Sequence, residues 1–309
     1  ATASTSMANT HRPLHNNGAG ARQRPTKLAP RLPALLLLLL ALQLVLAPAA
    51  LAALGGVRSA ILINMNTGKV LFAKNADAAI PPASLTKVMT MYLTLDAVQA
   101  KKLRLQEIIR IRPGVAKVGG SSMHLRTGER VSVSQLLTGA AVASGNDAAT
   151  ALALRVGGNQ RQFVRAMNAK TRALGMRRTV FKNPTGLPAA GQKTTARDMA
   201  ALTRAYLRSH PSAQVFHRTR FFTHRGRTMR NTNALLGTVA GVNGLKTGWT
   251  VASGYNLIVT AQRGKTRLLA VVLGGSSRNA RDGAARRLVE AGFRAPGSPK
   301  AVKKALGRR

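Results

Sequence analysis

Strand-like apolar stretches lie near both ends of the chain, and amphipathic stretches lie between them. The strand patterns occupy residues 59–64, 70–72, 215–222, 244–249, 255–261 and 268–273. The helical patterns occupy residues 85–98, 134–143, 147–156, 160–174, 195–208 and 280–291. Strands at both ends with helices between them predict an α+β domain, with one antiparallel sheet built from both termini and a cluster of helices.

Glycine-containing turns predict how neighbouring elements connect. Residues 66–68 (NTG) and 263–265 (RGK) each separate two strand patterns, which is typical of a hairpin. Gly145 permits a turn between two helical patterns. Ser144 and Asn146 are therefore expected on a loop between two helices.

The first 52 residues have the pattern of a secretory signal. Basic residues precede an apolar run over residues 34–46 that only Gln43 interrupts, and small residues with an A-x-A-like end follow. The alternative is an uncleaved membrane anchor, because counting on to Leu54 reaches roughly the length that a spanning helix needs. Both interpretations place the rest of the chain outside the cytoplasm, in the periplasm or on the outer face of the cytoplasmic membrane. We therefore expect a signal or anchor at 1–52, a globular domain at 53–295 and a mobile basic tail at 296–309.

The chain is strongly basic and contains no cysteine. Of its 309 residues, 48 are Lys or Arg and 8 are Asp or Glu, a formal charge of +40. Five basic residues and no acidic one precede residue 53, which leaves +35 on the remainder. Such a charge first suggests nucleic acid, but the basic residues are spread evenly, aromatic residues make up 4% and no nucleic-acid motif is present. We expect no nucleic-acid partner, and anionic cell wall or lipid headgroups as the electrostatic counterparts.

Histidines recur at a regular interval without predicting a metal site. His210, His217 and His224 are seven residues apart, which would place them on one face of a continuous helix. Pro211 and the strand pattern at 215–222 argue against such a helix. We expect no metal ion and no cofactor.

Three short strings in a fixed order carry the candidate chemistry. They are SLTK at residues 84–87, SGN at 144–146 and KTG at 246–248. Each string alone has an ordinary explanation: a helix-capping serine, a connector between helices, or a surface hairpin. Their order and long separations favour a shared site with a nucleophilic hydroxyl and amines that manage its proton.

Ser84 is the candidate nucleophile and Lys87 the candidate base. Ser84 would occupy the first turn of a helix, where the helix dipole favours a developing anion. Lys87 follows by three residues, on the same helix face and within reach of the hydroxyl. A desolvated lysine near other cations can have its pKa lowered enough to accept the serine proton.

The second and third strings supply the rest of the predicted site. From the inter-helix loop, the Ser144 hydroxyl can pass a proton to a leaving amine, and the Asn146 amide can hold a peptide carbonyl. On a strand, Lys246 adds positive charge, and the Thr247 hydroxyl can hold a substrate carboxylate.

Two further expectations concern the end of this strand. The absent side chain of Gly248 lets a peptide approach the strand edge. The backbone N–H groups of Ser84 and Trp249 are expected to form an oxyanion hole.

These strings and their flanks resemble the D-alanyl-D-alanine carboxypeptidase family of low-molecular-mass penicillin-binding proteins. The matching stretches are residues 82–90 (PASLTKVMT), 142–149 (VASGNDAA), 195–198 (TARD) and 244–250 (GLKTGWT). The resemblance runs from about Arg58 to Phe293. It implies a serine acyl-transfer enzyme of the β-lactamase/transpeptidase-like fold. The implied substrate is the D-alanyl-D-alanine end of peptidoglycan stem peptides, and β-lactam antibiotics would acylate the serine. By position, Arg281 matches a basic residue that the family places near the substrate carboxylate.

Three alternatives to a carboxypeptidase stay open. The sequence given extends only about sixteen residues beyond Phe293, where many family members continue into a β-rich domain and a membrane helix; members lacking that region include DD-endopeptidases that cut cross-links. A class A β-lactamase needs a glutamate between the second and third strings. The glutamates of this chain are Glu107, Glu129 and Glu290, and none of them lies between those strings. A non-catalytic wall-binding module would not need an intact Ser84 and Lys87 pair.

Overall fold

The computed structural model describes residues 54–307. The predicted signal or anchor at 1–52 lies outside these residues. Within the described range, no helix is long and apolar enough to cross a membrane.

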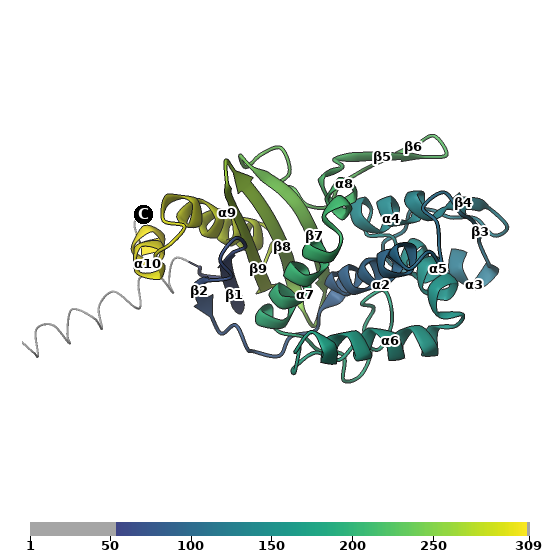
Figure 1. The fold of residues 1–309 in the computed structure, drawn as a ribbon, viewed down its shortest axis with the longest axis horizontal. Helices are drawn as coiled ribbons and strands as arrows, with labels where there is room; N and C mark the ends of the chain where they lie inside the picture. Colours follow the sequence, from purple (N-terminus) through teal and green to yellow (C-terminus); the bar gives the residue numbers. More distant parts are fainter. Residues whose placement is uncertain (1–53, 308–309) are drawn as a thin grey trace, which may run out of the picture. The chain divides into compact units, whose positions relative to one another are not determined.

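A five-stranded antiparallel sheet stands at the centre of the described residues (Figure 1). In spatial order its strands are β2 (Val70–Lys74), β1 (Ser59–Asn64), β9 (Thr266–Gly275), β8 (Gly254–Arg263) and β7 (Val242–Thr250). β1 and β2 come early in the chain and β7, β8 and β9 come late. The predicted antiparallel sheet from both ends and both predicted hairpins are therefore confirmed.

Alternate residues of the strands face two different layers of helices. In β1, Leu62 packs in one apolar cluster with α9 (Arg278–Arg294), whereas Ile61 packs in a second cluster with the remaining large helices. Figure 1 shows α9 and α10 (Pro299–Gly307) on one side of the sheet and α2 and α4 to α6 on the other. Burial on both faces explains why the central strands read as continuous apolar runs.

The second layer is built around α2 (Lys87–Gln99), whose residues 87–92 are all buried. The helices around α2 are α4 (Val133–Val142), α5 (Asn146–Gly157), α6 (Gln160–Ala173) and α7 (Ala196–Ser209). Several helices begin at a residue whose side chain accepts a hydrogen bond from a backbone N–H group of the first turn. This bond satisfies one of the N–H groups that have no partner within the helix. These capping residues are Ser132, Asn159, Thr195 and Ser277. The predicted helices are thus confirmed within a few residues at each end.

Short elements complete the described fold. They are the 3₁₀ turns η1 (Ala83–Thr86) and η2 (Pro211–Ala213), the helices α3 (Pro113–Ala116) and α8 (Gln214–Arg218), and the strands β3 (Ile108–Arg110), β4 (Arg130–Ser132), β5 (Phe221–His224) and β6 (Arg227–Arg230). β3 pairs with β4, and β5 pairs with β6, each as a separate antiparallel ladder.

The strand predicted at residues 215–222 is wrong over most of its length. The first part is helix α8, and a strand begins only at Phe221. A short apolar run does not distinguish a strand from a buried helical turn. Here α8 packs on β7, and its buried His217 and Phe216 face the protein interior.

The expected mobile tail is also wrong for residues 299–307, which form α10. Val302 and Leu306 are buried in the cluster with α9 and β2. These residues are four apart and lie on one helix face, whereas the neighbouring Lys303 and Lys304 are exposed. The basic character of the segment reflects only the outward face of a packed helix.

Candidate active site

The three strings converge on one pocket beside β7, the last strand of the described sheet. Its volume is about 360 Å³. η1 and the loop between α4 and α5 lie beside β7 and contribute Ser84 and Ser144. The pocket is lined by Ser84, Ser121, Ser144, Thr232, Thr247, Gly248, Trp249, Tyr255, Arg278 and Arg281. Within the described residues, this lining contains hydroxyls and cations and no carboxylate.

Ser84 and Lys87 are in direct contact, although not on a single α-helix. Ser84 lies in η1, and Lys87 is the first residue of α2. This corrects the expected first-turn placement of Ser84, because the α-helix starts three residues later. The Lys87 Nζ atom lies 2.8 Å from Ser84 Oγ.

Lys87 is fully buried and has polar partners on every side. Besides Ser84 Oγ, its Nζ donates to Asn146 Oδ1 at 2.7 Å and to the Thr185 carbonyl at 2.8 Å. A neutral amine has two N–H groups and one lone pair. Donation to Asn146 and Thr185 would leave that lone pair directed at the serine hydroxyl.

Burial lowers the pKa of Lys87 well below its ordinary value. The nearby charge of Lys246 lowers it further, whereas Asp147 acts in the opposite direction. Desolvation and a like charge both disfavour the ammonium form. The arrangement therefore favours an amine that can accept a proton.

Asn146 is placed differently from the expectation. Its Oδ1 accepts from Lys87, and its Nδ2 donates to the Gly119 carbonyl at 2.6 Å. Both ends of the amide are thus engaged within the protein. In this arrangement Asn146 orients Lys87, and the predicted contact with a peptide carbonyl would use only the remaining Nδ2 hydrogen.

Ser144 and Lys246 form a second hydroxyl–amine pair on the other side of the pocket. Lys246 Nζ donates to Ser144 Oγ at 2.9 Å and to the Thr247 carbonyl at 2.9 Å. Burial lowers the pKa of Lys246 to about 7, and the charge of Arg281 contributes. Ser144 has a φ of 59°, a left-handed conformation that is uncommon outside glycine and occurs often at functional sites.

Gly248 lets two parts of the site meet. A Cβ atom at this residue would lie 2.9 Å from the Ser84 nitrogen and 3.1 Å from the Leu85 nitrogen. The missing side chain thus allows η1 to pack on β7. The prediction attributed it to peptide access, and the structure adds this internal contact.

The pocket wall beyond Gly248 is aromatic and cationic. Trp249 is about half exposed, and its ring centroid is 5.8 Å from that of Tyr255, the residue opposite it on β8. Arg281 is buried, its Nε bonds to Asp282 Oδ1 at 2.8 Å, and its guanidinium is 6.0 Å from the Tyr255 ring. Arg281, predicted from position alone, does line the pocket.

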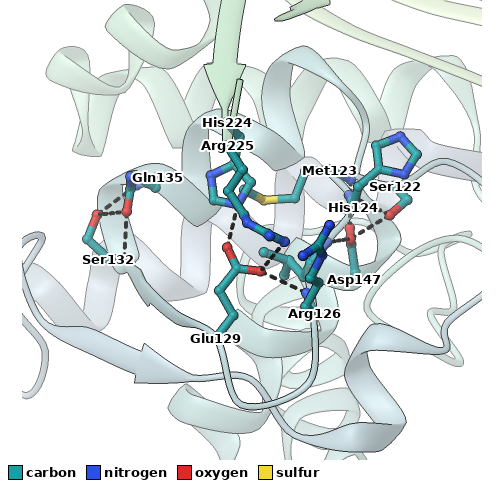
Figure 2. Close-up of polar contacts among 11 residues, drawn as sticks. Ser122, Met123, His124, Arg126, Glu129, Ser132, Gln135, Asp147, His224 and Arg225 are labelled. Atoms are coloured by element: carbon teal, nitrogen blue, oxygen red, sulfur yellow. Dashed lines mark hydrogen bonds and ion pairs between the residues drawn. The ribbon is translucent and has the colours of Figure 1, made fainter. Parts of the chain in front are cut away.

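Asp147 holds together the loop that approaches the second string. Its carboxylate accepts from Ser122 Oγ at 2.6 Å and from the backbone N–H groups of Met123 and Leu125 (Figure 2). Figure 2 also shows two separate contacts nearby: Glu129 bonds to His224 of β5, and Ser132 bonds to Gln135 at the start of α4. A carboxylate with several donors is well satisfied when buried. Asp147 therefore positions the loop beside Asn146 without entering the pocket.

Sequence reasoning missed several residues of the site. Thr232 Oγ1 accepts from the Thr247 hydroxyl at 2.7 Å, and the Thr185 carbonyl accepts from Lys87. Ser121, Tyr255 and Arg278 complete the missed lining. These residues lie on loops and elements outside the three strings, and no local pattern marks them.

The three regularly spaced histidines have separate partners. His210 contacts Asp96 at 2.7 Å, His217 Nδ1 contacts the Leu245 carbonyl at 3.1 Å, and His224 contacts Glu129 at 2.7 Å. Among residues 54–307, no cluster of three or more potential ligands is arranged to hold a metal ion.

Comparison with known proteins identifies the family. Residues 49–277 match the Peptidase_S11 model, described as D-alanyl-D-alanine carboxypeptidase. The fold is that of penicillin-binding proteins: the chain superimposes on penicillin-binding protein 6B from Escherichia coli with a TM-score of 0.74 and 38% identity, covering 77% of each chain. The chain belongs to the D-alanyl-D-alanine carboxypeptidase family, which confirms the resemblance and the expected fold.

Individual relatives are similar over most of this chain but not over most of their own length. D-alanyl-D-alanine carboxypeptidase DacF of Bacillus subtilis is 38% identical over 241 residues, which is 76% of this chain and 62% of DacF. A D-alanyl-D-alanine endopeptidase of Pseudomonas aeruginosa is 35% identical over 222 residues, 70% of each protein. The chain spans about three fifths of the length of the first carboxypeptidases it matches.

Proposed function

We propose that this chain is a serine-type D-alanyl-D-alanine carboxypeptidase that forms an acyl-enzyme on Ser84. The observation that carries the proposal is the 2.8 Å contact between Ser84 Oγ and the buried amine of Lys87 at the pocket. Membership of a D-alanyl-D-alanine carboxypeptidase family supports the substrate class. The substrate would be the D-alanyl-D-alanine end of a peptidoglycan stem peptide.

In the acylation step, Ser84 Oγ attacks the carbonyl carbon of the penultimate D-alanine. Neutral Lys87 takes the hydroxyl proton as the Oγ–C bond forms. Backbone N–H groups of Ser84 and Trp249 would stabilise the developing oxyanion. The C–N bond then breaks and the terminal D-alanine leaves as an amine.

The leaving amine requires a proton, which we assign to the second hydroxyl–amine pair. Ser144 Oγ would donate its proton and regain one from Lys246, with which it shares a 2.9 Å hydrogen bond. Before deacylation, the proton that Lys87 took from Ser84 passes through the pocket to the now neutral Lys246, which returns both amines to their starting states. A water molecule then attacks the acyl-enzyme ester, neutral Lys87 takes the proton of that water and gives it to Ser84 Oγ as the ester C–O bond breaks, and the shortened peptide is released. Ser84 recovers its proton in this step.

Substrate binding would use the cationic wall of the pocket. Arg281 and Thr247 would hold the terminal carboxylate of the peptide, with the Thr247 hydroxyl turning from Thr232 to the carboxylate and Lys246 adding positive charge behind them. Carboxylates are bound well by hydroxyls combined with guanidinium groups. β-lactams carry a comparable carboxylate and acyl group and would acylate Ser84 in the same way.

A DD-endopeptidase is the second candidate function. The Pseudomonas aeruginosa endopeptidase is matched over 70% of its length, a larger share than for DacF. Both activities would use the same acylation chemistry and differ in whether the leaving amine belongs to a free D-alanine or a cross-linked peptide. β-lactamase activity is less well supported, because no described glutamate lines the pocket. A non-catalytic wall-binding module is disfavoured by the contact between Ser84 and Lys87.

The proposed place of action is outside the cytoplasm, at the cell wall. The apolar N-terminal segment and the family's wall-directed activity support this location. The charge of +35 beyond residue 52 favours contact with anionic wall polymers or lipid headgroups. Such contacts should weaken as salt is added, and sedimentation with sacculi and anionic vesicles across a salt series would measure this.

Mass spectrometry of products from purified muropeptides tests the proposed function. Carboxypeptidase activity removes one terminal D-alanine from monomers, and endopeptidase activity separates cross-linked dimers. In parallel, labelled penicillin should add only to Ser84, and Ser84→Ala should lose both labelling and hydrolysis. A label recovered on Ser144, or an active Ser84→Ala protein, would refute the assignment of the nucleophile.

A further inference from the structure

Among the strands of residues 54–307, β3 pairs along one edge only. β3 and β4 form a two-stranded sheet, so only one side of β3 is paired. The Val133 N–H donates to the Glu107 carbonyl, and the Ile111 N–H donates to the Glu129 carbonyl. Hydrogen-bonded pairs alternate along an antiparallel ladder. The backbone groups of Ile108 and Arg110 therefore point away from β4.

This free edge faces a groove instead of a packed neighbour. The groove has a volume of about 390 Å³ and lies between β3 and the C-terminal half of α5. Apart from the β3 segment itself, it is lined by Val115, Ala151, Leu154, Arg155 and Gly158. β3 lies on the opposite side of the helical layer from the five-stranded sheet (Figure 1). An unprotected edge of this kind is a template for adding another strand.

The groove and its surroundings carry an excess of positive charge. Arg110 and Arg130 are exposed and directly opposite each other on β3 and β4, a placement of like charges that destabilises a sheet. Arg112 is also exposed, and among residues 54–307 none of these three arginines forms an ion pair. The acidic Glu107 is already bound to Arg155. A ligand with negative charge would relieve this repulsion.

The two faces of an added strand would meet different surroundings. Ile109 and Ile111 point toward the protein interior, and Leu154 and Val115 add to the apolar lining on that side. Arg110 and Arg112 lie on the outer face. Since side chains alternate along a strand, a complementary segment would alternate acidic and apolar residues.

A second copy of this chain cannot readily supply such a segment. The chain contains 8 acidic residues, and all lie within the described range. Each has a partner within its own chain: these residues are Asp77, Asp96, Glu107, Glu129, Asp147, Asp198, Asp282 and Glu290. We therefore expect the acidic segment to belong to a different protein.

We infer that the free edge of β3 is a docking site for an extended acidic segment of another protein. The segment adds as a third strand to β3 and β4, and its backbone bonds to the outward groups of Ile108 and Arg110. Its acidic side chains lie beside Arg110 and Arg112, and its apolar side chains enter the groove. This mode of binding combines backbone hydrogen bonds with side-chain selection at alternate positions.

The probe is a fluorescent short peptide that alternates glutamate and valine, titrated against the full chain by anisotropy. Two further peptides carry N-methyl groups on either the glutamate amides or the valine amides. In an extended strand the N–H groups of alternate residues point to opposite edges. One methylated peptide therefore loses the N–H groups that face β3, and the other keeps them. Losing these hydrogen bonds should weaken binding by about tenfold or more, while the other methylated peptide should bind like the parent.

Protein variants test the location. Arg110→Gln should weaken binding about tenfold because a charge-assisted contact is lost. Ile108→Pro removes an outward N–H that β4 does not use, and it should also weaken binding. The matched control is Arg227→Gln, at an arginine on β6 that is also exposed. Penicillin labelling of Ser84 reports that each variant remains folded.

Several results would overturn the inference. These are no binding of the parent peptide at low salt, equal affinity of both methylated peptides, or an equal loss in Arg227→Gln. Displacement of the peptide by anionic phospholipid vesicles, together with insensitivity to methylation, would show a membrane-binding patch instead. The methylation comparison remains decisive even if Ile108→Pro fails to fold.

Discussion

Gly248 packs directly on the backbone of Ser84. A Cβ atom at residue 248 would lie 2.9 Å from the Ser84 nitrogen, a separation that real Cβ atoms do not adopt. The neighbours at this point are backbone atoms, which cannot swing aside as the end of a flexible side chain can. The position of η1 on β7 therefore depends on this glycine.

Gly248→Ala should displace Ser84 from its position between Lys87 and the pocket. A shift of about 1 Å in a reacting group can cost roughly a hundredfold in rate, and we expect a loss of that size in the rate of penicillin acylation. Stopped-flow or gel-based labelling measures it. Gly283→Ala on α9 is the control, because a Cβ there would meet only Arg287 Nη1 at 3.7 Å. Equal rates for the two variants would contradict the structural role given to Gly248.

Lys87→Arg should abolish acylation while the fold is retained. Arginine keeps the positive charge but does not lose its proton near neutral pH, so it cannot act as the base. We expect labelling by penicillin to fall by several orders of magnitude. Lys193→Arg, at an exposed lysine, should label at the normal rate. Near-normal labelling of Lys87→Arg would mean that another group removes the Ser84 proton.

Lys246 should make stability depend on pH in a defined direction. Its pKa is lowered from 10.5 to about 7 by burial. Between these values the unfolded state binds more protons than the folded state, so the free energy of unfolding rises with pH across this window. Below about pH 7 the lysine is protonated in both states, and the cost of burying its charge is fully present.

The comparison with Lys246→Met isolates this contribution. The variant should be more stable than the parent at about pH 6, by up to several kcal/mol, and the difference should shrink toward about pH 10. Urea unfolding across the pH range measures it. Lys193→Met serves as the exposed control. A stability difference that is independent of pH would show that the pKa of Lys246 is not depressed.

The β-lactam acyl-enzyme should persist. Glu107 is bound to Arg155, Glu129 to His224 and Glu290 to Arg263, and none of the three lines the pocket. The route to rapid deacylation through a glutamate-activated water is therefore missing. Intact mass measured over time after removal of free penicillin should show a long-lived adduct. Rapid return to the unmodified mass would favour a β-lactamase.

α10 should contribute to stability because it buries apolar side chains. Leu306→Ala removes a side chain that is 4% exposed. A change of this kind typically costs about 2–5 kcal/mol, and we expect the lower part of that range near the end of a helix. Thermal or urea unfolding measures the loss. Lys303→Ala, on the exposed face of the same helix, should have little effect, and a similar loss in both variants would argue against the packing seen here.

The sequence by itself determined the parts of this protein that depend on local spacing. Ser84 and Lys87 are three residues apart, which is enough to bring hydroxyl and amine together even though a 3₁₀ turn replaced the expected helical turn. The alternation and apolar runs of β1, β8 and β9 predicted the sheet, because the burial of a strand on two faces is written in its own residues.

Only the tertiary structure decided which distant groups meet. Asn146 bonds to Lys87, and Thr232 bonds to Thr247. Gly248 leaves room for η1 to pack on β7. In each case the two partners belong to different segments of the sequence. The helix α8 and the docked α10 were missed for a related reason. A short segment of ambiguous or amphipathic pattern takes the structure that buries its apolar side chains best, and that surface is built by other parts of the chain.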